Sequence, residues 1–128
     1  MIDKKTGILE INNNLIFSPY FKYEDFKKTL YFKGQGSVRM IYLDEKQIID
    51  GRKYLVSFFF KEEKLYMVSL INCDKNISES DEKQRKKKHD EILLQEKIED
   101  GKEYNWGKVK SEYDARSNVS SINIYYSL

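Results

Sequence analysis

The sequence predicts one α+β domain spanning residues 1–128. An antiparallel β-sheet of about six to seven strands, with a central three-stranded meander, is expected to pack against one main helix and a short N-terminal helix. Three observations predict this fold. A chain of 128 residues can bury a core without disulfides. The hydrophobic fraction of 40% and the single proline argue against disorder. The 10 tyrosines and 7 phenylalanines favour strands, because flat rings pack well on a pleated surface.

The first element is a predicted hairpin. Two short apolar runs, Ile8–Ile11 and Leu15–Phe17, are separated by Asn12-Asn13-Asn14. Asparagine tolerates the left-handed backbone conformations that tight turns require. The three asparagines are therefore predicted to reverse the chain between two strands.

A short helix is predicted next. Pro19 ends the second strand, and Tyr23–Thr29 is expected to be helical, burying Phe26 and Leu30. The glycines of Gly34-Gln35-Gly36 are expected to end this unit.

The middle of the chain predicts the meander. Val38–Ile49 is rich in β-branched and aromatic residues, and Asp50-Gly51 follows as a hairpin signal, because a type I′ turn needs positive φ at both central positions. Tyr54–Phe60 is the expected second strand. After the polar reversal Lys61–Lys64, the third strand is expected at Leu65–Ile71.

Both faces of this meander are apolar. Along the second strand, Tyr54, Val56 and Phe58 alternate with Leu55 and Phe59, so large side chains point to both sides. A half-exposed sheet would alternate apolar with polar residues. Each face is therefore expected to be covered by helices, by another sheet layer or by a partner.

Ser78–Asp100 is the predicted main helix, with Ser78 or Ser80 as its N-cap and Gly101 as its C-terminal cap. Its first half is polar on all sides and is expected to project into solvent. Its second half places four residues near one stripe that is expected to face the sheet: His89, Ile92, Leu93 and Ile98.

Two strands are predicted at the end of the chain. Val109, Ser111 and Tyr113 alternate with charged residues, while Ile122 and Ile124 alternate with polar ones. This alternation predicts half-exposed outer strands.

Composition narrows the function. The net charge of +2 makes a nucleic-acid partner unlikely, because phosphate contacts usually require a clear basic excess. Cys73 is the single cysteine and suits a reducing compartment. No signal peptide or membrane-length apolar run is visible, so a cytoplasmic protein without a membrane partner is expected.

Catalytic, cofactor-binding and metal-ligating residues are predicted to be absent. His89 has no companion ligands at metal spacing, and Cys73 ends a hydrophobic strand, where cysteine usually packs as a small apolar residue. Gly34-x-Gly36 is too short for a phosphate loop. The basic run Lys83–Lys88 lies among acidic residues at helical spacing, which indicates a solvated helix face rather than a phosphate-binding patch.

The last hairpin holds the candidate partner-binding residues. Trp106, within Tyr104-Asn105-Trp106-Gly107, is expected to be a core anchor. The loop between the last strands either is a simple turn or presents a binding rim, since tyrosine and arginine are enriched at protein-binding hot spots. The interface candidates are Glu112, Tyr113, Asp114, Arg116 and Tyr125.

The same region carries a resemblance to a family. The residues that carry it begin with Gly51, Tyr54, Phe60 with Lys64-Leu65, and the helix around Arg85 and His89, and they continue with Tyr104-x-Trp106-Gly107, Tyr113-Asp114-x-Arg116-Ser117 and Ser121-Ile122-x-Ile124. Together they resemble small bacterial immunity proteins of polymorphic toxin systems used in contact-dependent growth inhibition. The resemblance implies a stoichiometric complex with a cognate toxin domain, which the protein would neutralise by occlusion. It implies no particular binding residues.

Other functions stay open at this point. A pocket between the sheet and the main helix would suit a small-ligand-binding module or a minor enzyme. The run Lys83–Lys88 would be the contact of a nucleic-acid binder. The apolar meander would also allow pairing of two subunits as a homodimer.

Overall fold

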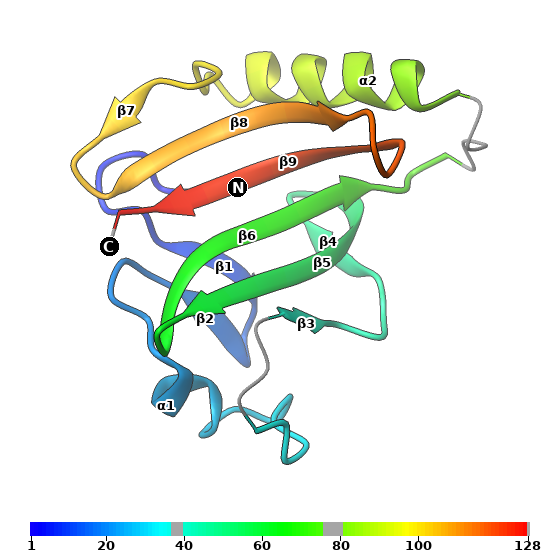
Figure 1. The fold of residues 1–128 in the computed structure, drawn as a ribbon. Helices are drawn as coiled ribbons and strands as arrows, with labels where there is room; N and C mark the ends of the chain where they lie inside the picture. The colour runs from blue at the N-terminus through cyan, green and yellow to red at the C-terminus, as the bar shows by residue number, and fades with distance from the viewer. Residues whose placement is uncertain (37–39, 76–80, 128) are drawn as a thin grey trace.

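A computed structural model describes residues 1–36, 40–75 and 81–127, and it has the predicted α+β fold (Figure 1). Within these residues, seven strands form one antiparallel sheet in the order β3-β5-β6-β9-β8-β7, with β4 also pairing with β5, and β1 and β2 form a separate hairpin. The strands are β1 (Leu9–Asn12), β2 (Leu15–Phe17), β3 (Met40–Tyr42), β4 (Gln47–Ile49), β5 (Arg52–Lys61), β6 (Lys64–Asn72), β7 (Glu103–Tyr104), β8 (Gly107–Asp114) and β9 (Val119–Tyr126). The helices are α1 (Tyr23–Phe26) and α2 (Glu82–Gln95).

The predicted hairpin turns are confirmed. Asn12 Oδ1 accepts a hydrogen bond of 2.8 Å from the backbone of Asn14 and closes the turn between β1 and β2. Asp50 and Gly51 connect β4 to β5 with φ values of 51° and 78°. Both values are positive, as the type I′ turn requires.

The predicted strand Val38–Ile49 is wrong as a single strand. The chain forms β3 and β4 instead, and both pair with β5. Three consecutive charged residues, Asp44-Glu45-Lys46, leave the sheet between them, although Leu43 N still donates a hydrogen bond of 3.0 Å to Val56 O. Val38 lies outside the described residues.

Helix α1 is shorter than predicted. Phe26 is buried as expected, but Leu30 is 77% exposed, so its predicted burial is wrong. The reason is local, because the Thr29 hydroxyl donates a hydrogen bond of 2.8 Å to Phe26 O. A side-chain hydroxyl of this kind competes with the backbone donors that would extend the helix.

Helix α2 ends before the predicted boundary. The chain closes it with Lys97 at φ 59°, so Gly101 is not the C-terminal cap. Ile98 N donates to Leu93 O at 2.8 Å and Lys97 N donates to Leu94 O at 3.1 Å, which is the bond pattern of a Schellman motif. Ile98 and Leu93 are both buried, and their burial favours this early reversal. The expected N-caps Ser78 and Ser80 lie outside the described residues.

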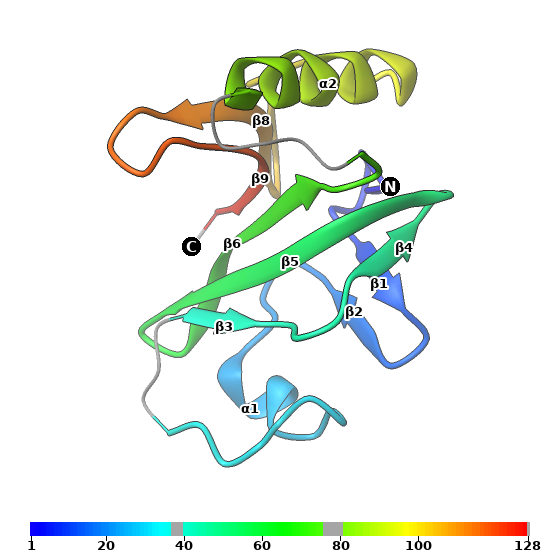
Figure 2. The same ribbon diagram turned by 90° about the vertical axis from the view of Figure 1, so that its right-hand side faces the viewer.

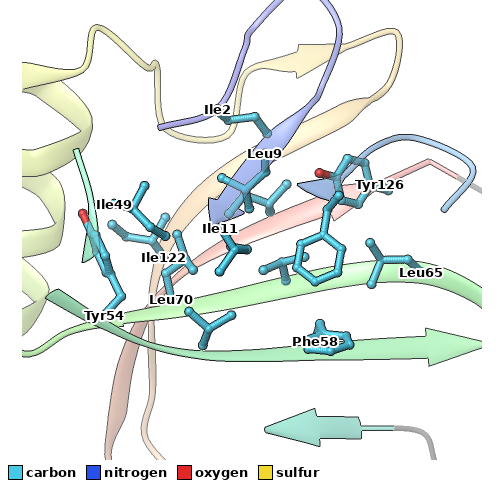
Figure 3. Packing of buried hydrophobic residues seen from close by; sticks show 14 of the residues in the cluster. Ile2, Leu9, Ile11, Ile49, Tyr54, Phe58, Leu65, Leu70, Ile122 and Tyr126 are labelled. Atoms are coloured by element: carbon cyan, nitrogen blue, oxygen red, sulfur yellow. The ribbon is translucent and has the colours of Figure 1, made fainter. Parts of the chain in front are cut away.

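All the packing elements lie against one face of the large sheet, which we call the covered face. The β1–β2 hairpin and α1 cover one part of it, and α2 covers the part formed by β6, β8 and β9 (Figure 2). The covered face consists of Tyr54, Val56, Phe58, Phe60, Leu65, Val68, Leu70, Val109, Ile122, Ile124 and Tyr126. Figure 3 shows Leu9 and Ile11 of β1 pointing toward these strands.

Strand β9 is central, not an outer strand as predicted. It lies between β6 and β8, and Ile122 and Ile124 are fully buried on the covered face. The polar residues that suggested exposure, Ser121 and Asn123, are only 9% and 8% exposed. Their small side chains are shielded by larger neighbours on the adjacent strands.

The first half of α2 does not project into solvent. Glu82 is 6% exposed, and Ser120 of β9 donates its backbone N–H to Glu82 Oε2 at 3.2 Å and its hydroxyl to Glu82 O at 2.9 Å. Arg85 forms an ion pair with Glu82 and donates from Nε to Asn72 O at 3.2 Å. The polar first turn of α2 is thereby held on the sheet by polar groups whose hydrogen bonds are satisfied.

His89 completes this docking. Its side chain is fully buried, and Nε2 accepts a hydrogen bond of 3.0 Å from the backbone N–H of Asn72. The neutral ring therefore carries its proton on Nδ1. Burial, with the charge of Arg85, lowers the pKa of His89 from 6.5 to about 4.

The pH dependence of unfolding tests this placement. Between pH 6.5 and 4 the unfolded chain binds a proton at His89 that the folded chain excludes. Stability should therefore fall as pH decreases through this window, by roughly 3 kcal/mol from this group. Urea unfolding of His89→Gln, which keeps an acceptor near the Nε2 position, should show a correspondingly weaker pH dependence. Identical pH slopes for the two proteins would contradict the buried neutral imidazole.

Candidate functional site

The second face of the sheet is the candidate site, and we call it the open face. None of the described helices and no strand of the β1–β2 hairpin lies over it (Figure 2). Its side chains alternate with those of the covered face along each strand. The open face consists of Met40, Tyr42, Ile48, Lys53, Leu55, Ser57, Phe59, Tyr66, Met67, Ser69, Ile71, Lys108, Lys110, Glu112, Ser121, Asn123 and Tyr125.

Large apolar and aromatic side chains cross the open face from strand to strand. Met40 is paired with Phe59, Phe59 with Met67, and Met67 with Tyr125. On the same face, Tyr42 is 66% exposed and Leu55 is 41% exposed. Contiguous exposed apolar surface of this kind marks interaction sites more often than isolated exposed residues do.

A polar cluster lies beside this row, at β8 and β9. The Tyr125 hydroxyl and the Asn123 amide both donate to Glu112 Oε1, the amide at 3.0 Å. Lys110 Nζ lies 3.9 Å from Glu112 Oε2, and Lys108 Nζ lies 5.8 Å from the centre of the Tyr125 ring. The carboxylate is therefore held in one orientation within the face.

The electrostatics of this cluster follow from its contacts. Partial burial alone would raise the pKa of Glu112, but hydrogen bonds from Tyr125 and Asn123 and the charges of Lys110 and Lys108 lower it below its ordinary value. Burial and the bond to Glu112 raise the pKa of the Tyr125 hydroxyl. At neutral pH the pair is a carboxylate accepting from a neutral phenol. Neither pKa is shifted toward neutral pH, as the pKa of a general acid or base working there would be.

The structure brings together only two of the five interface candidates. Glu112 and Tyr125 meet on the open face, while Tyr113, Asp114 and Arg116 lie at the exposed tip of the β8–β9 hairpin. The Tyr113 hydroxyl donates to Asn118 Oδ1 at 2.8 Å, in the turn between β8 and β9. Asp114 Oδ1 accepts from Arg116 N at 2.9 Å, so these two residues shape the turn.

Sequence reasoning missed Asn123, Lys110 and the apolar row beside them. A signal for the row was present, because Leu55 and Phe59 make the second face of the meander apolar. The polar cluster had no such signal, since it depends on the register in which Glu112 pairs with Ser121.

The other residues singled out in the sequence pack against the fold or make local contacts within it. Within Lys83–Lys88, Arg85 points to the sheet and Lys86 Nζ lies 2.7 Å from Asp90 Oδ1. Cys73 is half-buried beyond the end of β6, and its backbone N donates to Lys53 O at 2.9 Å. Trp106 is in the core, as predicted, and is 6% exposed.

Across residues 1–36, 40–75 and 81–127, no group of three or more His, Cys, Asp or Glu side chains is placed to hold a metal ion. Neither described helix combines the length and the apolar character needed to span a bilayer.

Comparisons of the chain with models of protein families, with curated proteins and with solved structures find no match.

Two tyrosine variants test the polar cluster. Tyr125→Phe removes one of the donors to Glu112, so the pKa of Glu112, followed by carbon NMR of its carboxyl group, should rise toward its ordinary value. Tyr113→Phe is the matched control, because its hydroxyl bonds to Asn118 instead. Equal Glu112 pKa values in the wild type and in Tyr125→Phe would contradict the described cluster.

Proposed function

We propose that this chain is an immunity-type protein that binds a cognate toxin domain through the open face and neutralises it by steric occlusion. The observation that carries the proposal is the sheet face that the described chain leaves uncovered although large apolar side chains cross it. Tyr42 and Leu55, at 66% and 41% exposure, are the clearest of these. A partner that buried them would supply the cover that the sequence predicts for this face.

The dimensions of the face favour a protein over a small ligand. Its residues come from β3, β4, β5, β6, β9 and β8, which is the breadth that a protein interface of about 800 Å² per partner requires. Tyr42, Tyr66 and Tyr125 provide the rigid aromatic surface that is common at interface hot spots.

A ligand pocket between sheet and helix is the weaker alternative. Ile92 and Leu93 of α2 and Val109 and Ile122 of the sheet are at most 2% exposed, so the contact between these elements is filled by side chains. Nucleic-acid binding through Lys83–Lys88 is weakened too, because Arg85 and Lys86 are engaged with Glu82 and Asp90.

Charge indicates which partner surface fits. The open face carries Lys53, Lys108 and Lys110 against one carboxylate, Glu112. An acidic or neutral surface would complement it, whereas the basic surface of a nucleic-acid-binding toxin would be repelled. The same excess disfavours a homodimer, because two-fold pairing would bring the lysines of two open faces together. A cytoplasmic site of action belongs to this proposal, since immunity proteins meet their toxins there.

One pair of variants tests the binding face. Leu55→Glu places a charge in the open face, and we expect it to weaken the complex with the toxin encoded by the adjacent open reading frame by at least about tenfold. Affinity would be measured by calorimetry, and neutralisation by survival of cells that co-express the toxin. The matched control is Ile16→Glu on the outer side of β2, where Ile16 is 47% exposed. It should leave both readouts unchanged.

Two outcomes would contradict the proposal. The first is equal loss of binding in Leu55→Glu and Ile16→Glu, which would place the contact elsewhere. The second is a dimer of the free wild-type chain in sedimentation velocity that Leu55→Glu converts to monomers, which would make a second copy the occupant of the open face.

A further inference from the structure

A second surface feature lies at the β7 edge of the large sheet. A cavity of about 510 Å³ is lined there by residues of the N-terminal loop, of the segment after α2 and of the loop around β7, and Figure 1 shows where these parts of the backbone lie. Its lining includes Lys4, Lys5, Lys97, Glu99, Lys102 and Tyr104. Residues 4–5 and 97–105, which are distant in sequence, thus contribute to one basic cavity.

Positive charge dominates this cavity. Four lysines line it against Glu99 alone. In the described part of the chain, none of the four ammonium groups has a carboxylate oxygen within 4.0 Å, whereas Lys33, Lys86 and Lys110 elsewhere do. Clustered like charges repel one another, and a bound anion would relieve this repulsion.

The backbone that carries these lysines is held by specific contacts. Trp106 Nε1 donates to Lys4 O at 2.8 Å, and Lys4 Nζ donates to Lys97 O at 2.9 Å. Tyr104 stacks on Trp106 with ring centres 5.2 Å apart. On Trp106, Gly7 packs so closely that an added Cβ would lie 2.7 Å from the indole. The cavity is therefore preorganised, which lowers the entropic cost of binding.

Lys97 is an unusual residue for its position. It occupies the left-handed backbone region, φ 59°, at the end of α2, where helices most often place glycine. A lysine is strained there, and backbone strain of this kind is concentrated at functional sites. Its side chain adds a positive charge to the cavity, although the left-handed backbone at this position favours glycine, which has no side chain.

From these observations we infer that the lysine cavity binds a small anion with at least two linked phosphate groups. Ammonium groups bind phosphate oxygens as point charges, and several are needed to balance a polyphosphate. The site is separate from the open face and does not depend on the proposed toxin complex. A nucleic-acid strand would need a basic track extending beyond the cavity, and the net charge of +2 argues against one.

Calorimetric titration of the full chain with inorganic tripolyphosphate tests this inference. Lys5→Gln/Lys102→Gln removes two positive charges from the cavity and leaves the Trp106–Lys4 and Lys4–Lys97 hydrogen bonds in place, so it should weaken binding by at least roughly tenfold. Lys61→Gln/Lys64→Gln removes the same charge from the β5–β6 turn and should change affinity by less than about twofold. Thermal unfolding monitored by circular dichroism identifies any variant that fails to fold, and Lys97→Gln provides an independent third test.

Any one of three results would overturn the inference. The first is no heat of binding and no shift of the Lys97 or Lys102 amide resonances with tripolyphosphate at millimolar concentration. The second is an equal loss of affinity in both double variants, which would indicate a response to net charge alone. The third is binding of a single-stranded oligonucleotide through Lys5 and Lys102 without binding of tripolyphosphate, which would make the cavity part of a nucleic-acid surface.

Discussion

The fold depends on removing one face of the large sheet from water. Phe58, Val68 and Ile124, from three adjacent strands, are fully buried there, and burial of such side chains contributes about 25 cal/mol per Å². The N-terminal hairpin and α1 cover one part of this face, with Phe17 and Phe26 packed on Phe58 at ring-centre distances of 4.9 and 5.5 Å. Helix α2 covers the rest. Because the hairpin, α1 and α2 all lie on the same face, these elements leave the opposite face of the sheet uncovered.

Polar contacts position α2 on the sheet. Helix α2 has few apolar residues, so hydrophobic packing alone would specify its placement poorly. Glu82 and Arg85 are paired at the sheet, and His89 accepts from the backbone of β6. Buried polar groups are costly unless they are satisfied, so these contacts favour one register of the helix on β6 and β9. The alignment of β8 and β9 beneath it then brings Glu112 to Tyr125 on the open face.

Local chemistry made part of this structure predictable. The Asp50-Gly51 turn, the asparagine turn and the second and third strands of the meander follow from neighbouring residues. The order of the strands in the sheet does not follow from neighbouring residues. Strand β9 looked like an outer strand because Ser121 and Asn123 are polar. The C-terminal end of α2 could not be predicted either, because Lys97 rather than a glycine adopts the left-handed conformation there. Of the candidate site, Glu112 and Tyr125 were selected from the sequence, but their hydrogen bond depends on a cross-strand register that sequence patterns do not specify.

Hydroxyl-radical footprinting of the free protein and of the proposed complex with a toxin domain tests most directly the proposal that the open face is the binding surface. In the free protein, Met40, Tyr42 and Met67 should be oxidised while buried Tyr54 is protected. In the complex, those three residues should become protected, and Tyr20, 83% exposed outside the open face, should react as before. Unchanged oxidation of Met40, Tyr42 and Met67 in a stable complex would contradict the account.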